Sequence, residues 1–219
     1  MMSSILNSEQ KMIFRKIKSA LNDVTESYWN DIQFMLTESD LVAKVFSLLD
    51  GELGKFQVHS EIRPFKKLSA TKSRVIRKRN KDENNKKDVE YVWLKADRNT
   101  GTRFDLCVID TECKFWKEAI EKAKGERNAL RYWRLPSYPF KGIRAVIEFK
   151  VRVSGNIKRI GYDIQKLKKM CERNNQCLGF LVILDRCAPD RGITDIIDMI
   201  EGTGIHLFGL KPKPDSTSF

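Results

Sequence analysis

Two apolar segments of the chain carry charged residues in their interior, and this combination limits the folds that the sequence can adopt. Residues 103–109 read Arg-Phe-Asp-Leu-Cys-Val-Ile, and residues 143–153 read Ile-Arg-Ala-Val-Ile-Glu-Phe-Lys-Val-Arg-Val. Apolar residues on both faces are typical of strands buried in the centre of a sheet. A charge buried there is costly unless it is paired or binds a metal. The two segments therefore predict central strands that carry a polar site.

The flanking segments predict helices and strands in alternation. Apolar residues at helical spacing predict helices at 7–21 (with Ser8 as N-cap), 26–35, 37–50 (capped by Thr37 or Ser39), 114–133, 162–173 and 193–200. Extended patterns predict further strands at 56–65, 89–94, 178–184 and 205–210. We therefore expect an α/β fold with a mixed central sheet and helices on both faces.

The same patterns divide the chain into a main domain and flanking parts. We expect an N-terminal helical extension at 1–36, an α/β domain at 37–210 with insertions at about 66–100 and 111–142, and a flexible tail at 211–219. The first insertion holds a basic run, 72–87, with eight Lys or Arg residues against two acids. Such a run is either a solvated surface or a docking segment for an acidic protein or RNA, and the sequence leaves both open.

The net charge and the cysteine content limit the classes of binding partner and the cellular compartment that the sequence predicts. The 219 residues include 41 Lys and Arg against 29 Asp and Glu, a net charge of +12, which favours nucleic acid as the partner. No apolar run reaches the length of about 20 residues that a membrane helix needs, and the first twenty residues lack the apolar core of a signal peptide. Five scattered cysteines without a CxxC pair, and two histidines, argue against a zinc site or a disulfide framework. We expect a cytoplasmic protein with no membrane partner.

The charged residues in the two apolar segments form the candidate site. Glu148 and Lys150 are two positions apart on one strand, so their side chains point to the same face, and Asp105 joins them if the strands are neighbours. Two close carboxylates attract a hard cation such as Mg²⁺, and a bound cation lowers the pKa of its water. A lysine beside them can hold that water or stabilise the charge of the transition state. The competing interpretation is a purely structural ion-pair cluster.

At this point the chain resembles the PD-(D/E)xK nuclease superfamily. The similarity lies in two predicted strands, 103–106 and 146–150, the second with the sequence Val-Ile-Glu-Phe-Lys. It continues in the predicted helical residues 161–167 and in the predicted strand 179–184. The resemblance implies a restriction-endonuclease-like fold, with Asp105, Glu148 and the Phe149 carbonyl holding Mg²⁺, for which Mn²⁺ substitutes. It also implies that Lys150 is the catalytic lysine. Members often add an acid from the helix before the first core strand, which points to Glu38, with Glu61 as the competitor.

Two departures from the family pattern stand out. Phe104 replaces the proline of the motif, and Asp105 and Glu148 are 43 positions apart, so 111–142 must be an insertion between neighbouring strands. The residues expected to contact nucleic acid are Gln165, Lys158, Arg159, Lys166, Lys169, Arg77, Lys78 and Arg79.

The expected function is metal-dependent hydrolysis of DNA by an endonuclease, of a restriction, defence, phage or mobile-element type. RNA stays open as the polymer. A homodimer is expected only because cutting both strands of a duplex usually needs two sites. The alternative is a catalytically inactive protein on the same fold that binds nucleic acid or a protein partner.

Overall fold

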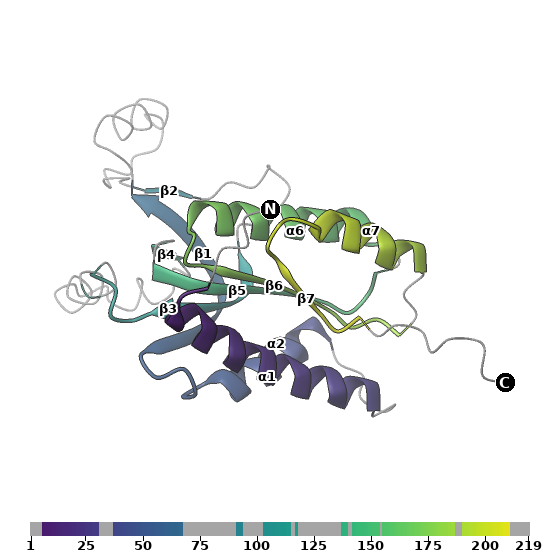
Figure 1. Ribbon diagram of the computed structural model, residues 1–219, viewed down its shortest axis with the longest axis horizontal. Helices are drawn as coiled ribbons and strands as arrows, with labels where there is room; N and C mark the ends of the chain where they lie inside the picture. Colours follow the sequence, from purple (N-terminus) through teal and green to yellow (C-terminus); the bar gives the residue numbers. More distant parts are fainter. Residues whose placement is uncertain are drawn as a thin grey trace, which may run out of the picture.

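The described part of the chain folds into three layers, with a sheet between two pairs of helices (Figure 1). The computed structural model describes residues 6–30, 37–67, 91–93, 103–114, 117, 137–139, 142–153, 155–186 and 190–210. The elements are α1 (Ser8–Asn30), α2 (Glu38–Leu49), β1 (Phe56–Lys67), β2 (Tyr91–Trp93), β3 (Phe104–Asp110), β4 (Ser137–Pro139), β5 (Ile143–Lys150), α6 (Ile157–Arg173), β6 (Leu178–Ile183), α7 (Asp190–Ile200) and β7 (His206–Phe208). The mixed α/β fold with helices on both faces of the sheet is confirmed.

The sheet is mixed, and its order brings the two charged strands together. The strands follow the order β2-β1-β3-β5-β6-β7, and β4 pairs with β1. β1, β3 and β5 are antiparallel neighbours, whereas β5, β6 and β7 run parallel. Leu106 of β3 lies opposite Ile147 of β5, so the next step of the same register places Asp105 opposite Glu148. Residues 111–142 therefore connect two neighbouring strands, as expected.

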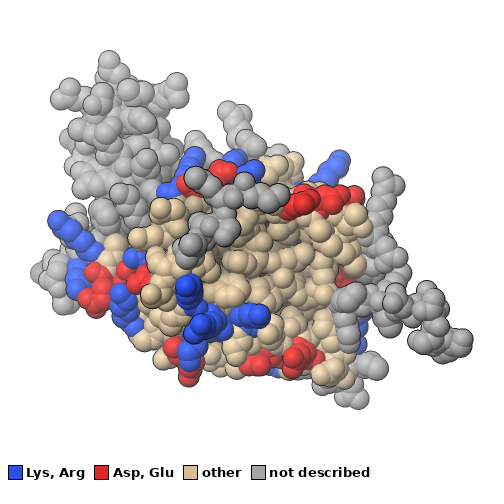
Figure 2. All heavy atoms as spheres, viewed as in Figure 1, with Lys and Arg blue, Asp and Glu red and all other residues tan. Residues whose placement is uncertain are grey.

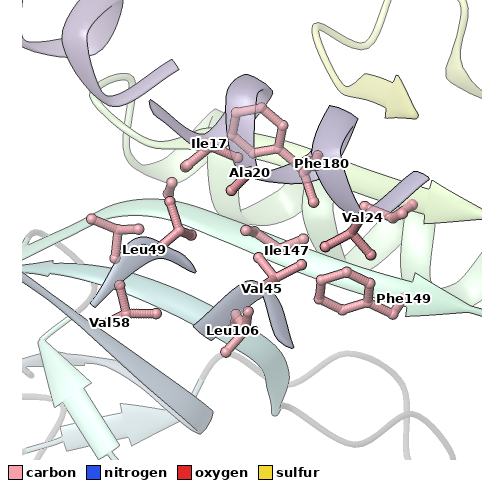
Figure 3. Close-up of a cluster of buried hydrophobic side chains, with 14 of the residues drawn as sticks. Ile17, Ala20, Val24, Val45, Leu49, Val58, Leu106, Ile147, Phe149 and Phe180 are labelled. Atoms are coloured by element: carbon pink, nitrogen blue, oxygen red, sulfur yellow. The ribbon is translucent and has the colours of Figure 1, made fainter. Parts of the chain in front are cut away.

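One face of the sheet is covered by α1 and α2. Figure 3 shows Ile17, Ala20 and Val24 of α1 directed at the strand residues Ile147 and Phe180. Because side chains alternate along a strand, every second residue of β3 and β5 faces this layer. Residues 1–36, expected as an extension, thus contribute a helix to the main core.

α1 differs from the two helices predicted at 7–21 and 26–35. It is one helix from Ser8 to Asn30, because the segment between those ranges contains no Gly or Pro and Val24 continues the buried stripe. Its N-cap is Asn7 rather than Ser8: the Asn7 side chain accepts a hydrogen bond from the Gln10 amide (2.8 Å), and the Gln10 side chain accepts one from the Asn7 amide (3.1 Å). Residues 31–35 lie outside the described residues.

The opposite face of the sheet is covered by α6 and α7. The buried residues of α6, among them Ile160, Ile164 and Leu167, recur at helical spacing and pack against Val146 and Leu181 of the sheet. Glu148 and Lys150 share the face of Val146, so their charged groups enter this otherwise apolar layer.

Some expected elements fall outside what the structure describes. β2 is the described part of the strand predicted at 89–94. Only residues 114 and 117 of the helix predicted at 114–133 are described. The described helices include none long and apolar enough to cross a membrane.

Candidate functional site

The three predicted key residues meet at the end of β5, where β3 and α6 come close. Asp105 is half-buried, and its Oδ2 accepts a hydrogen bond of 2.8 Å from the backbone N–H of Phe149. This bond fixes the Asp105 carboxylate between Glu148 and Lys150. The structure therefore brings together Asp105, Glu148 and Lys150, which are far apart in the sequence.

Glu148 is the most deeply buried charged group of the site. It is 2% exposed, and its Oε1 lies 2.5 Å from Nζ of Lys166 on α6. Lys166 is thus the close charged partner of this buried oxygen. Burial raises the pKa of the Glu148 carboxyl well above its usual range, and the charge of Lys166 only partly offsets this effect.

Lys150 lies at the same end of the sheet and is surrounded by acceptors. Its Nζ donates to the Phe149 carbonyl at 2.7 Å, lies 3.2 Å from Oδ2 of Asp163 and lies 3.7 Å from Oε1 of Glu38. Burial lowers the pKa of Lys150, but Asp163 and the other carboxylates outweigh burial and raise it. Lys150 therefore stays protonated beside the two carboxylates.

Glu38, one of the two competing acids, lies at the site beside Lys150. Thr37 caps α2: its side chain accepts from the Asp40 amide, and Asp40 accepts from the Thr37 amide. This capping box fixes the first turn of α2 and aims Glu38 at Lys150. Glu61 belongs to β1, but its side chain lies outside the described residues.

Two residues on α6 complete the cluster, and neither was expected there. Asp163 bridges the two lysines, with Oδ1 3.1 Å from Lys166 Nζ and Oδ2 3.2 Å from Lys150 Nζ. Lys166, expected to contact phosphate, is instead buried. Its side chain is 10% exposed and points at Glu148 and Asp163 rather than away from the helix. The sequence signal was their spacing of three residues, which places both on the inner side of the helix beside Leu167.

The donors of the site suit a hard divalent cation. Asp105 and Glu148 supply carboxylates, which are ligands that such a cation prefers. The cluster contains four carboxylates, from Glu38, Asp105, Glu148 and Asp163, against the ammonium groups of Lys150 and Lys166. With all four carboxylates ionised, the excess of two negative charges equals the charge of one divalent cation.

The residues do not form a ready-made cage for the cation. The described residues contain no group of three or more His, Cys, Asp or Glu side chains spaced to hold a metal. The Phe149 carbonyl, expected as a ligand, accepts from Lys150. Mg²⁺ takes one or two carboxylates and keeps several waters, so Asp105 and Glu148 are the residues that could hold it.

The expected nucleic-acid contacts are only partly described. Lys158, Arg159 and Gln165 are exposed on α6, and Lys169 is half-buried. Arg77, Lys78 and Arg79 lie outside the described residues. On the face drawn in Figure 2, Lys and Arg side chains of the described residues form small groups, with Asp and Glu side chains in separate groups and uncharged surface between them.

Comparison with known proteins adds no relative to this description. The chain matches no protein-family model, no curated protein and no solved structure, so its function is inferred from the site itself.

Proposed function

We propose that this chain is a Mg²⁺-dependent endonuclease of the PD-(D/E)xK type that hydrolyses phosphodiester bonds in DNA. One observation carries the proposal: Asp105, Glu148 and Lys150 converge from two neighbouring central strands at one end of the sheet. A structural ion pair does not need an excess of carboxylates over ammonium groups. β5 is followed by the helix α6 and the strand β6. The resemblance to the PD-(D/E)xK superfamily rests on the same order of a strand, a helix and a strand.

The site residues divide into groups that hold the cation and groups that act on the substrate. Asp105, Glu148 and, once Lys150 moves away, the Phe149 carbonyl would hold Mg²⁺ or Mn²⁺. When bound, the cation makes hydroxide available near neutral pH and neutralises charge on the phosphate. Lys150 orients the attacking water or stabilises the developing negative charge on the phosphate oxygens. Glu38, 3.7 Å away, orients Lys150.

DNA is the proposed substrate because of the net charge and of the exposed residues on α6. Lys158 and Arg159 stand at the start of α6, the helix that carries Asp163 into the site. Cations there can contact the phosphates that flank a scissile bond. A restriction, defence, phage or mobile-element role, a cytoplasmic location and a homodimeric assembly belong to the same proposal.

A second candidate function is supported by the contacts of the two lysines. Lys166 already neutralises Glu148, and Lys150 already bonds the Phe149 carbonyl. A site that keeps these contacts permanently is a binding module without catalysis, which recognises nucleic acid or a protein partner on the same fold.

Cleavage of supercoiled plasmid DNA separates the two candidates. The wild type is incubated with Mg²⁺, Mn²⁺ or EDTA beside Glu148→Ala and the control Glu172→Ala, whose exposed glutamate lies on the outer side of α6. The endonuclease proposal expects nicking or linearisation that requires metal, survives in the control and disappears in Glu148→Ala. DNA binding without cleavage by any of the proteins supports the binding module instead.

A further inference from the structure

Lys166 is held by more contacts than a surface lysine on a helix normally has. Its Nζ lies 2.5 Å from Glu148, lies 3.1 Å from Asp163, and donates to the Arg103 carbonyl at 2.7 Å. It also lies 5.1 Å from the centre of the Phe104 ring. These partners come from β3, β5 and α6, so one ammonium group joins the three elements that build the site.

The position of this ammonium group coincides with the expected place of the metal. A cation that binds Glu148 must approach the same carboxylate, whose Oε1 is buried and has Lys166 as its near neighbour. Two cations at hydrogen-bond or coordination distance from one oxygen repel each other strongly in a buried environment. A metal that takes the same Glu148 oxygen must therefore replace the Lys166 contact at that oxygen.

We propose that Lys166 is an internal counter-ion that a divalent cation must displace from Glu148, so that the lysine and the metal compete for this carboxylate. The inference rests on the proposed function, because it assumes that Glu148 is a metal ligand. Asp163 and the Arg103 carbonyl remain available to the displaced ammonium group, so it need not be left without a partner. Lys166 is thus a positioning residue, which keeps Glu148 in place while no metal is bound.

Metal affinity tests the competition without reference to cleavage. Binding of Mn²⁺ is followed by the electron paramagnetic resonance signal of the free ion, in mildly alkaline buffer, for the wild type, Lys166→Met and the control Lys168→Met. Lys168 lies on the same helix and is 51% exposed. Removing the competing cation is expected to tighten Mn²⁺ binding by about tenfold or more in Lys166→Met, the factor that a charge-assisted contact is worth. The control should bind as the wild type does.

The outcomes separate this inference from the proposed function. Equal affinity of Lys166→Met and the wild type, or weaker binding by the variant, overturns the competition but leaves a metal-dependent nuclease intact. Absence of Mn²⁺ binding to the wild type and the variant overturns both.

A measurement on the wild type alone guards against a variant that fails to fold. Reductive methylation labels lysine ammonium groups according to their accessibility, and mass spectrometry reads each site. Lys166 should be labelled several-fold faster with saturating Mg²⁺ than with EDTA, whereas Lys168 should be labelled equally in both. Protection of Lys166 that Mg²⁺ leaves unchanged refutes its displacement.

Discussion

Replacement of Glu148 by glutamine should change how the stability of the metal-free protein depends on pH. The Glu148 carboxyl is 2% exposed, and burial raises its pKa well above the ordinary value of 4.5. The folded protein therefore binds this proton more tightly than the unfolded chain does. By linkage, the stabilisation is complete below the unfolded pKa and is lost as the pH rises through the folded pKa. Glutamine has nearly the same shape and no proton to lose.

The magnitude follows from the single proton involved. One proton bound by the folded state and not by the unfolded state changes the free energy of unfolding by about 1.4 kcal/mol per pH unit. The wild type should therefore lose stability relative to Glu148→Gln between about pH 4.5 and the raised pKa. Within this window, the difference in the free energy of unfolding, variant minus wild type, should rise by up to about 1.4 kcal/mol per pH unit. Well above pH 4.5, the stability of the variant relative to the wild type should therefore be clearly higher than it is at pH 4.5.

The assay is urea unfolding in EDTA, followed by tryptophan fluorescence over a pH series. Glu172→Gln, at an exposed glutamate of α6, supplies the reference for a glutamate outside the site. A difference between Glu148→Gln and the wild type that stays constant with pH would refute the reasoning. A difference that falls with rising pH would mean that Lys166 keeps Glu148 ionised even without metal.

Three further predictions test α1, the proposed DNA contacts and a half-buried histidine. Ile17→Ala, at a fully buried position of α1, should lower the free energy of unfolding, measured in urea, by about 2–5 kcal/mol. A decrease in this free energy of less than about 1 kcal/mol would mean that α1 is a loosely attached extension. The double change Lys158→Gln and Arg159→Gln should reduce the slope of log affinity for DNA against log salt by about 2, and an unchanged slope would remove both from the interface. His206 packs 5.2 Å from the Phe180 ring, and burial lowers its pKa, so wild-type stability should fall as the pH drops through 6.5 towards that lowered pKa. Urea unfolding of His206→Phe should lack this loss, and identical pH profiles would contradict it.

The two charged strands themselves were predictable because the relevant signals are local, whereas their pairing entered the prediction only as a condition, which the structure meets. Apolar residues on both faces of 103–109 and 143–153 marked central strands, and strand alternation placed Glu148 and Lys150 on one face. The capping pattern that begins at Thr37 was equally readable, and the structure confirms it.

The partners on α6 could not be predicted because they depend on tertiary contacts. Lys166 stands next to Lys168 and Lys169, and such a run usually marks a solvated helix face. Only the packing of α6 on β5 shows that Lys166 faces a buried carboxylate. The length of α1 was missed for a similar reason: the stretch around Val24 is polar, and its burial against the sheet outweighs its weak helical pattern.

The most direct test of the central claim is DNA cleavage by Asp105→Asn. The asparagine side chain can still accept the hydrogen bond from the Phe149 amide, so the variant retains the contact that joins β3 to β5 while it loses the negative charge. Under Mg²⁺, with folding and DNA binding equal to those of the wild type, supercoiled plasmid cleavage should fall at least about a hundredfold, the scale of losing one strong electrostatic contribution. Cleavage by Asp105→Asn at the wild-type rate would contradict the assignment of this site.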